Sequence, residues 1–164
     1  MNVRTSMTRV TRWAATAAMG LLFLAAPARA FAQNATGSLV QVKAKGSVDQ
    51  VVDQLKKMVA SNGMMVMGEL HQGKVIGMTG LSLESESIFV GNPQVGKEAF
   101  GADAGVGVAL PVRLNVFKNA QGATIVTYVP PSEILKNLHN AKVDEVAKML
   151  DGKLHSMVGM LGGM

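Results

Sequence analysis

Two stretches of the chain repeat apolar residues at helical spacing. Between residues 47 and 61 the apolar positions recur every three to four residues, and a second stripe runs from Val143 to Val158. Ser47 and Gln50 fit a capping box, in which each side chain satisfies the other residue's free backbone N–H. These patterns predict a helix over residues 47–61 and a long helix from about residue 142.

Other segments alternate apolar and polar residues with a period of two, which is typical of strands. We predict strands over residues 39–45, 64–71, 84–90, 109–118 and 123–129. The last two flank Asn119-Ala120-Gln121-Gly122, which predicts a hairpin. Short helices are predicted over residues 94–100 and 132–137, Gln72-Gly73 is predicted as a turn or loop, and residues 74–83 fit no single period.

The order of strand, helix, several strands and helix indicates an α+β fold. We predict an antiparallel sheet with helices packed on one face, in a single domain over residues 39–161 that follows a flexible lead over residues 33–38. The other face of such a sheet stays open.

Strand alternation assigns side chains to the two faces. The predicted helix-facing set is Val40, Val42, Met64, Val66, Leu70, Leu110, Val112, Leu114, Val116 and Ile125. The predicted open-face set is Lys43, Met65, Met67, Glu69, His71, Arg113, Asn115, Phe117 and Tyr128. This second set mixes large apolar groups with charges, which suits either a ligand site or a dimer interface.

Residues 1–32 contain the three parts of a secretory signal. Three arginines between positions 4 and 12 form a basic start, and a mostly apolar stretch follows over residues 13–26. Small residues then precede two cleavage sites, one after Ala30 and one after Ala32. A membrane-spanning helix needs about 20 apolar residues, so this stretch is short for an anchor. We predict a signal peptide, with cleavage after Ala32 preferred, and a periplasmic or secreted protein; an uncleaved anchor is the alternative.

Removal of this segment changes the charge of the protein. Four of the 16 Lys and Arg residues lie in it, which leaves 12 against 11 Asp and Glu, a net charge of +1. A nucleic-acid surface would need clustered basic residues, so we predict no nucleic-acid partner and no membrane contact after cleavage. The chain has no cysteine. Disulfides and thiol chemistry are therefore excluded.

His71 and Arg113 are the residues best suited to chemistry. A histidine side chain can act as a base or as a ligand, and Glu69 lies two residues before His71. Arg113 is the single arginine after residue 32, and its planar fork suits a carboxylate or phosphate. Arg113 could instead pair with Glu69 across the sheet, and His71 could be a half-exposed side chain at a turn.

Asn92 and Tyr128 complete the set of candidate ligand-binding residues. Asn92 precedes a proline, which favours a turn, and its side chain could also hold the approach to a pocket. Tyr128 is the single tyrosine, for which an edge hydrogen bond or core packing is the alternative role. We predict no catalytic set and no cofactor, because no nucleophile elbow, phosphate loop or zinc-protease motif occurs.

Methionine is the unusual feature of the composition, with 12 residues. Thioethers are soft ligands that select Cu(I). On the predicted faces, Met65 and Met67 share one side of a strand with His71, which raises the alternative of an envelope copper-binding protein. Methionine is also a common filler of irregular cores.

Several segments, taken in order, resemble the domain-of-unknown-function 302 family. They are Ile88-Phe89-Val90-Gly91-Asn92-Pro93, Leu110-Pro111-Val112-Arg113-Leu114, the glycine turn into a strand that ends in Tyr128, and Pro131. His71 fits the same pattern, and the resemblance covers roughly residues 45–140. It implies a TATA-binding-protein-like α+β fold and supplies no activity.

These observations predict a ligand-binding or interaction module that uses the open sheet face. Arg113 and His71 would anchor a small anionic molecule, or the face would contact a second copy of the chain. One alternative is a small hydrolase or isomerase with His71 as its base. The other alternative is the methionine-based copper protein.

Overall fold

A computed structural model describes residues 39–162. The predicted signal peptide over residues 1–32 and the lead over 33–38 lie outside these residues. Within residues 39–162, every helix is too short or too polar to cross a membrane.

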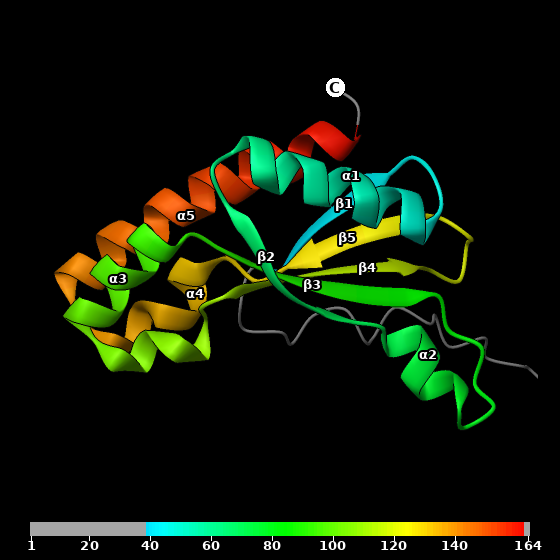
Figure 1. Cartoon of the computed structure of the whole chain (residues 1–164), viewed down its shortest axis with the longest axis horizontal. Coiled ribbons are helices and arrows are strands. Elements are labelled where there is room, and N and C mark those ends of the chain that lie inside the picture. Colours follow the sequence, from blue (N-terminus) through cyan, green and yellow to red (C-terminus); the bar gives the residue numbers. More distant parts are fainter. Residues whose placement is uncertain (1–38, 163–164) are drawn as a thin grey trace, which may run out of the picture. The chain divides into compact units, whose positions relative to one another are not determined.

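Five strands form one antiparallel sheet, in the spatial order β1-β5-β4-β3-β2 (Figure 1). The strands are β1 (Val40–Ala44), β2 (Met65–Leu70), β3 (Ser85–Gly91), β4 (Val112–Lys118) and β5 (Thr124–Tyr128). The predicted hairpin is present as β4 and β5. β4 begins at Val112 and not at Ala109, because residues 104–108 form the 3-10 helix η1 (Ala104–Val108) and Pro111 has no N–H for the ladder.

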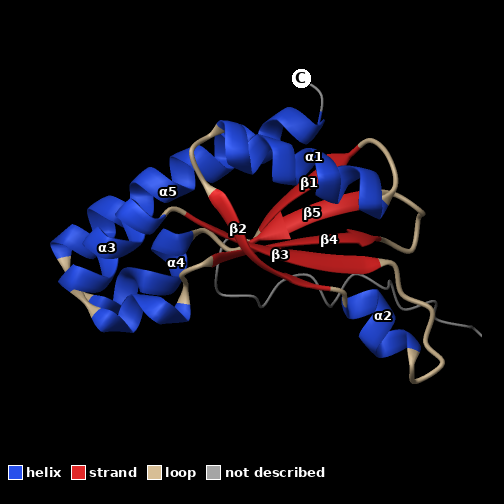
Figure 2. Cartoon of the chain, in the orientation of Figure 1, coloured by secondary structure: helices blue, strands red, loops and turns tan. Residues whose placement is uncertain are grey.

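The helices are distributed between one face of the sheet and the region beyond its strand ends (Figure 2). They are α1 (Val48–Ser61), α2 (Gln72–Gly77), α3 (Pro93–Ala102), α4 (Pro131–Leu135) and α5 (Ala141–Gly159), with short 3-10 turns η2 (Lys136–Leu138) and η3 (Met160–Gly162). The predicted capping box is confirmed, because the Ser47 Oγ accepts from Gln50 N and the Gln50 Oε1 accepts from Ser47 N.

The helix α2 was not expected from the sequence, which predicted a turn or loop at Gln72-Gly73. The carbonyl of His71 accepts hydrogen bonds from the N–H groups of Lys74 and Val75, which closes the first helical turn. A helix of six residues is too short to display an apolar stripe.

The main core lies between the sheet and the two long helices. α1 and the C-terminal half of α5 cover the face formed by alternate residues of the strands, including Ile88, Leu114 and Val126. A second apolar cluster joins the N-terminal half of α5 to α3, η1 and α4. The molecule is therefore an α+β fold with a five-stranded antiparallel open sheet, as the sequence predicted.

The predicted face assignments are wrong at positions in β2 and β5, because the side-chain alternation of these two strands has a different phase. The residues concerned are Glu69, Leu70, His71, Ile125 and Tyr128. In β5 it is Val126, fully buried, that faces the helices, while its neighbour Ile125 pairs with Phe117 on the open face. In β2 the register shifts between Val66 and Gly68. An extra residue in one strand reverses the side-chain alternation that follows it.

Candidate functional site

The open face of the sheet carries a polar network centred on Ser87. Its hydroxyl accepts hydrogen bonds from Arg113 Nε at 2.9 Å and from Gln72 Nε2 at 2.8 Å, and it donates to Asn115 Oδ1 at 3.0 Å. Ser87 is fully buried, so these three bonds satisfy a hydroxyl that has no access to water. The network fixes the Nε edge of the Arg113 guanidinium.

Three elements, β3, β4 and α2, bring this network together. Ser87 lies on β3 opposite Asn115 of β4, and Arg113 lies opposite Phe89 in the same pair of strands. Gln72, the first residue of α2, reaches the same face from the end of β2. Its Oε1 atom is buried and has no hydrogen-bond partner in the described chain. A buried acceptor without a partner carries a desolvation cost, which a water molecule or a ligand donor would relieve.

Arg113 borders a hollow with a volume of about 530 Å³. Apolar side chains form much of its wall: Leu39, Phe89, Val108, Leu110 and Ile134. Arg113 is exposed, and among residues 39–162 no carboxylate lies within 4.0 Å of its guanidinium. The predicted alternative of an Arg113–Glu69 pair is wrong.

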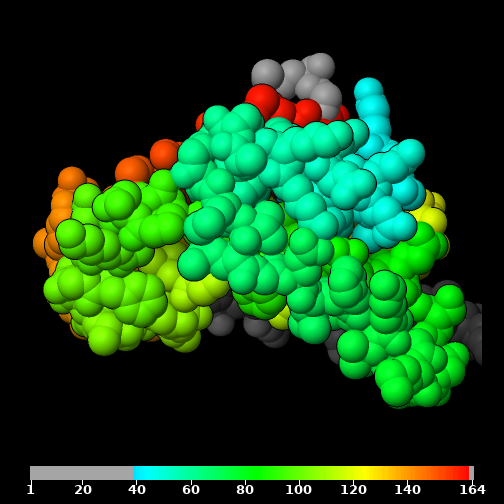
Figure 3. Space-filling model, viewed as in Figure 1, coloured from blue at the N-terminus to red at the C-terminus, as the bar shows by residue number. Residues whose placement is uncertain are grey.

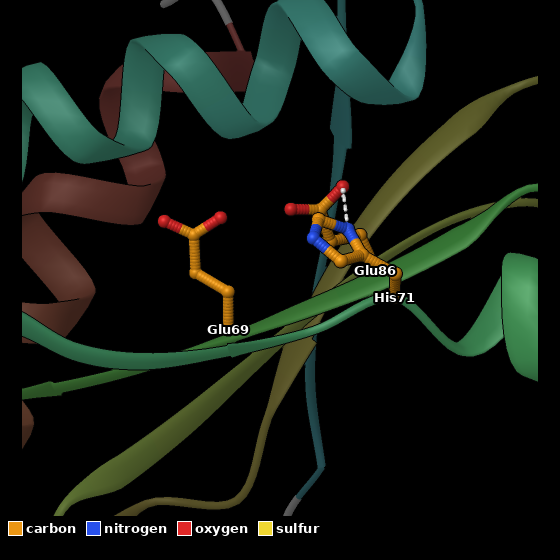
Figure 4. Close-up of side chains that lie close together, drawn as sticks. All are labelled: Glu69, His71 and Glu86. Carbon is orange, nitrogen blue, oxygen red and sulfur yellow. Dashed lines mark ion pairs between the residues drawn. The ribbon is translucent and has the colours of Figure 1, made fainter.

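Glu69 and His71 lie on the other face, beside α1. Figure 4 shows Glu69, His71 and Glu86 pointing to the same side of the sheet. Glu69 Oε2 accepts from Lys56 Nζ of α1 at 2.8 Å, and His71 Nδ1 lies 3.3 Å from Glu86 Oε2. In the space-filling view, α1 and β2 form adjoining parts of this surface (Figure 3).

The ion pair between Lys56 and Glu69 shifts both groups toward their charged forms. The hydrogen bond from Lys56 lowers the pKa of Glu69 below its ordinary value, against the opposing effect of desolvation. The same hydrogen bond raises the pKa of Lys56, and the charges of Glu69, Glu86 and Asp53 add to it. This face therefore stabilises a positive charge next to Glu69.

The chain matches the family described as "Domain of unknown function DUF302" over residues 40–161. It belongs to the DUF302 family. The match confirms the resemblance found in the sequence and extends it through the C-terminal helix α5, which the sequence motifs did not reach. It does not match any curated protein.

A solved relative has the same fold as this DUF302 domain. It is described as the crystal structure of an uncharacterized conserved protein DUF302 from Bacillus stearothermophilus. The TM-score is 0.70 at 18% sequence identity, and the alignment covers 75% of this chain and 97% of that chain. At this identity the likeness concerns the fold alone.

The structure gives Asn92 two structural contacts in the DUF302 domain. Its Oδ1 accepts from the N–H groups of Gln94 and Val95, which caps α3, and its Nδ2 donates to the carbonyl of Gly63 at 2.6 Å. Asn92 also borders a separate apolar hollow of about 230 Å³. Both predicted roles, the turn and the approach to a pocket, are compatible with this position.

Tyr128 belongs to the core and not to the open face. It is 3% exposed and packs with the main apolar cluster on the helix side. Burial raises the pKa of its hydroxyl, and the negative charge of Asp151 adds to the effect. The residue therefore has the packing role that the sequence left as an alternative, although it also borders the Arg113 hollow.

Met65 of β2 does not share a face with His71. Met65 pairs with Gly91 before the bulge, whereas His71 follows the strand and lies beside Glu86 on the helix side. At about 3.4 Å per strand residue, six positions separate Met65 and His71 by roughly 20 Å. The face that Met65 was predicted to share with His71 in the copper alternative is therefore absent.

Three residues of these sites had no signal in the sequence: Ser87, Gln72 and Glu86. Ser87 and Glu86 alternate along β3 and so point to opposite faces, one toward Arg113 and the other toward His71. Serine and glutamate in a strand are common on exposed surfaces, and only strand pairing brings them to an arginine and a histidine.

Proposed function

We propose that this DUF302 domain binds a small organic anion with an apolar body in the hollow beside Arg113. The observation that carries the proposal is an exposed guanidinium held at its Nε by buried Ser87 and free of carboxylate partners in the described chain. A guanidinium fixed along one edge presents its remaining N–H groups to a carboxylate in a bidentate geometry.

The wall of the hollow narrows the class of ligand. Apolar side chains around one fixed charge are typical of sites for small molecules that have a hydrocarbon part and one polar group. Phe89 and Val108 line the hollow together with Arg113, so a carboxylate on the guanidinium would leave the hydrocarbon against them. A medium-chain carboxylate such as octanoate has this shape and charge.

The proposal includes export of the protein. Residues 1–32 have the basic start, apolar stretch and small-residue cleavage positions of a signal peptide. We infer that the mature domain meets its ligand in the periplasm or outside the cell. Native mass spectrometry of protein exported by its own signal would give the mass of the mature chain and of any retained molecule.

Substitution of Arg113 by Ala tests the site directly. We expect it to weaken octanoate binding at least about tenfold, since a hydrogen bond to a charged group contributes about 1.5–3 kcal/mol. Calorimetric titration gives the dissociation constant of octanoate. The same titration with uncharged octan-1-ol gives the part of the binding free energy that comes from apolar contact alone. Lys43→Ala is the matched control, because it removes a positive charge from the same face without touching the hollow.

Three results would contradict this function. Octanoate binding that is equal in the wild type and Arg113→Ala would remove Arg113 from the site. A loss of folding stability as large as the loss of binding would make Arg113 a structural residue. A ligand-free dimer in native mass spectrometry, dissociated by Arg113→Ala, would make the open face an interface between copies.

Catalysis by His71 is the second candidate. The specific observation is the Glu86 carboxylate 3.3 Å from His71 Nδ1, because a carboxylate at one ring nitrogen can orient a histidine that acts as base through the other. In the described chain His71 has no hydrogen bond to a hydroxyl nucleophile. Turnover abolished by His71→Ala in a folded protein is the result that this candidate requires.

A further inference from the structure

Glu69, His71 and Glu86 bring three metal-binding groups together on the face beside α1, away from the Arg113 hollow. One ligand atom of each residue lies within 4.8 Å of those of the other two. The residues come from β2, the position after it, and β3. In Figure 4 the three side chains project from neighbouring strands into the space below α1.

The distances fit a tetrahedral ion. The 3.3 Å between His71 Nδ1 and Glu86 Oε2 is close to the separation of about 3.3–3.4 Å between two ligands that bind one zinc ion at about 2.0–2.1 Å. Glu86 lies on β3 and its side chain is largely buried, with 13% of its surface exposed. Glu69 is a third exposed and has three rotatable side-chain bonds, so it can close the remaining distance.

The donor atoms select the class of ion. One imidazole nitrogen and two carboxylate groups, without a thiolate or thioether, suit a borderline divalent ion such as Zn²⁺ and do not suit Cu(I). Calcium and magnesium prefer oxygen ligands alone, which His71 does not supply.

The surrounding charges favour a cation at this place. A hollow of about 280 Å³ lies here, and its charged lining residues are Asp49, Asp53, Glu69, Glu86, Lys56 and Lys74. Carboxylates outnumber ammonium groups there by four to two. The ammonium of Lys56 already neutralises part of this negative charge through its bond to Glu69. Lys56 is therefore the cation with which a metal ion competes.

We propose that Glu69, His71 and Glu86 form a Zn²⁺ site whose fourth position is open to water or to a ligand. The site is independent of the proposed anion hollow, because the two lie on opposite faces of the sheet. Neither therefore depends on the other, and Arg113→Ala serves as a variant in which zinc binding stays unchanged.

Titration of Zn²⁺ against a chromogenic chelator tests the proposal on metal-stripped protein without a histidine tag. We expect one zinc ion per chain, and at least about tenfold weaker binding in His71→Ala and in Glu86→Gln, since even supporting groups of zinc sites contribute 10–100-fold. His155→Ala is the matched control, because His155 is an exposed histidine on α5. Circular dichroism confirms that each variant is folded.

A substitution of Lys56 should change the zinc affinity in the opposite direction from substitutions of the proposed ligands. Lys56→Met removes the competing cation, so we expect tighter zinc binding than in the wild type, while Lys57→Met, at an exposed neighbouring position of α1, leaves it unchanged. A tetrahedral Co²⁺ absorption spectrum that disappears in His71→Ala would support the same ligands. Absence of stoichiometric zinc binding, or binding that both His71→Ala and Glu86→Gln leave intact, would overturn the proposal and leave a surface ion-pair network.

Discussion

Single hydrogen bonds determine how the charged residues of this domain are presented. Ser87 directs the guanidinium of Arg113 because its hydroxyl is buried and accepts from Arg113 Nε. Lys56 has the corresponding effect on Glu69, whose carboxylate it holds on the opposite face. The chemistry available at each face therefore depends on a neutral or oppositely charged partner that lies far away in the sequence.

The ion pair between Lys56 and Glu69 gives the stability of the fold a defined pH dependence. Because the folded-state pKa of Glu69 is lowered from its ordinary 4.5, its contribution is present above that pH and is lost as the pH falls through the folded value. Because the pKa of Lys56 is raised from 10.5, its contribution is present below that pH and is lost as the pH rises through the folded value.

We expect Glu69→Gln to lower the free energy of unfolding by roughly 0.2–1 kcal/mol at pH 7, the usual range for exposed ion pairs. At a second, acidic pH below the folded-state pKa of Glu69, this difference should disappear, since protonation removes the charge in the wild type as well. Urea unfolding at both pH values measures it, and the double variant with Lys56→Met isolates the pair. An equal difference at both pH values would show that the ion pair is not its source.

At the scale of elements, the bulge in β2 decides which residues can act together. Met65 lies before the register shift and Glu69 after it, so a strict alternation over six residues assigns Glu69 to the wrong face. The extra residue turns Glu69 toward Lys56 and α1. The bulge thereby separates Glu69 from Arg113 and places it with His71 and Glu86.

The turn from β3 into α3 depends on the side chain of Asn92, which joins two elements. We expect Asn92→Ala to destabilise the fold by about 1–3 kcal/mol, because it removes the helix cap and the bond to the Gly63 carbonyl. Urea unfolding gives the value. Asn92→Ser is the control, since a serine keeps the cap and is too short to replace the second bond.

Asn92→Ser should therefore retain part of the stability that Asn92→Ala loses. Equal destabilisation by the two substitutions would mean that the cap contributes nothing and that the contact with Gly63 carries the whole effect. Wild-type stability in Asn92→Ala would rule out both contacts as significant.

At the scale of the whole molecule, the division of the sheet into a buried and an open face can be measured on adjacent residues of β5. Val126→Thr should cost about 1–3 kcal/mol, because it places a hydroxyl without a partner in the main core. Ile125→Thr should cost less than half as much, since Ile125 lies on the partly solvated face. Both substitutions retain a β-branched residue, so strand propensity is matched.

Chemical denaturation of the two variants gives this comparison. The reverse order, with Ile125→Thr the more destabilising, would restore the face assignment that alternation alone predicted for β5. It would also place Thr127, and with it one wall of the Arg113 hollow, on the opposite side of the sheet.

The sequence predicted the elements well where a local signal was strong. The period over residues 47–61 and the capping box identified α1, and the stripe from Val143 identified α5, because both signals lie within one helix. It failed for α2, whose six residues are too few for a period. Among the candidate site residues, Arg113 was placed on the correct face and Glu69, His71 and Tyr128 were not.

By itself, the sequence determined the α+β class, the antiparallel sheet and the identity of the residues able to do chemistry, because these follow from local periodicity and side-chain type. Only the tertiary structure decided which of those residues meet. The bulge in β2 and the pairing of β3 with β4 assign Arg113 to Ser87 and His71 to Glu86, on opposite faces. Such contacts join residues far apart in the chain, and a shift of one residue in register exchanges the faces.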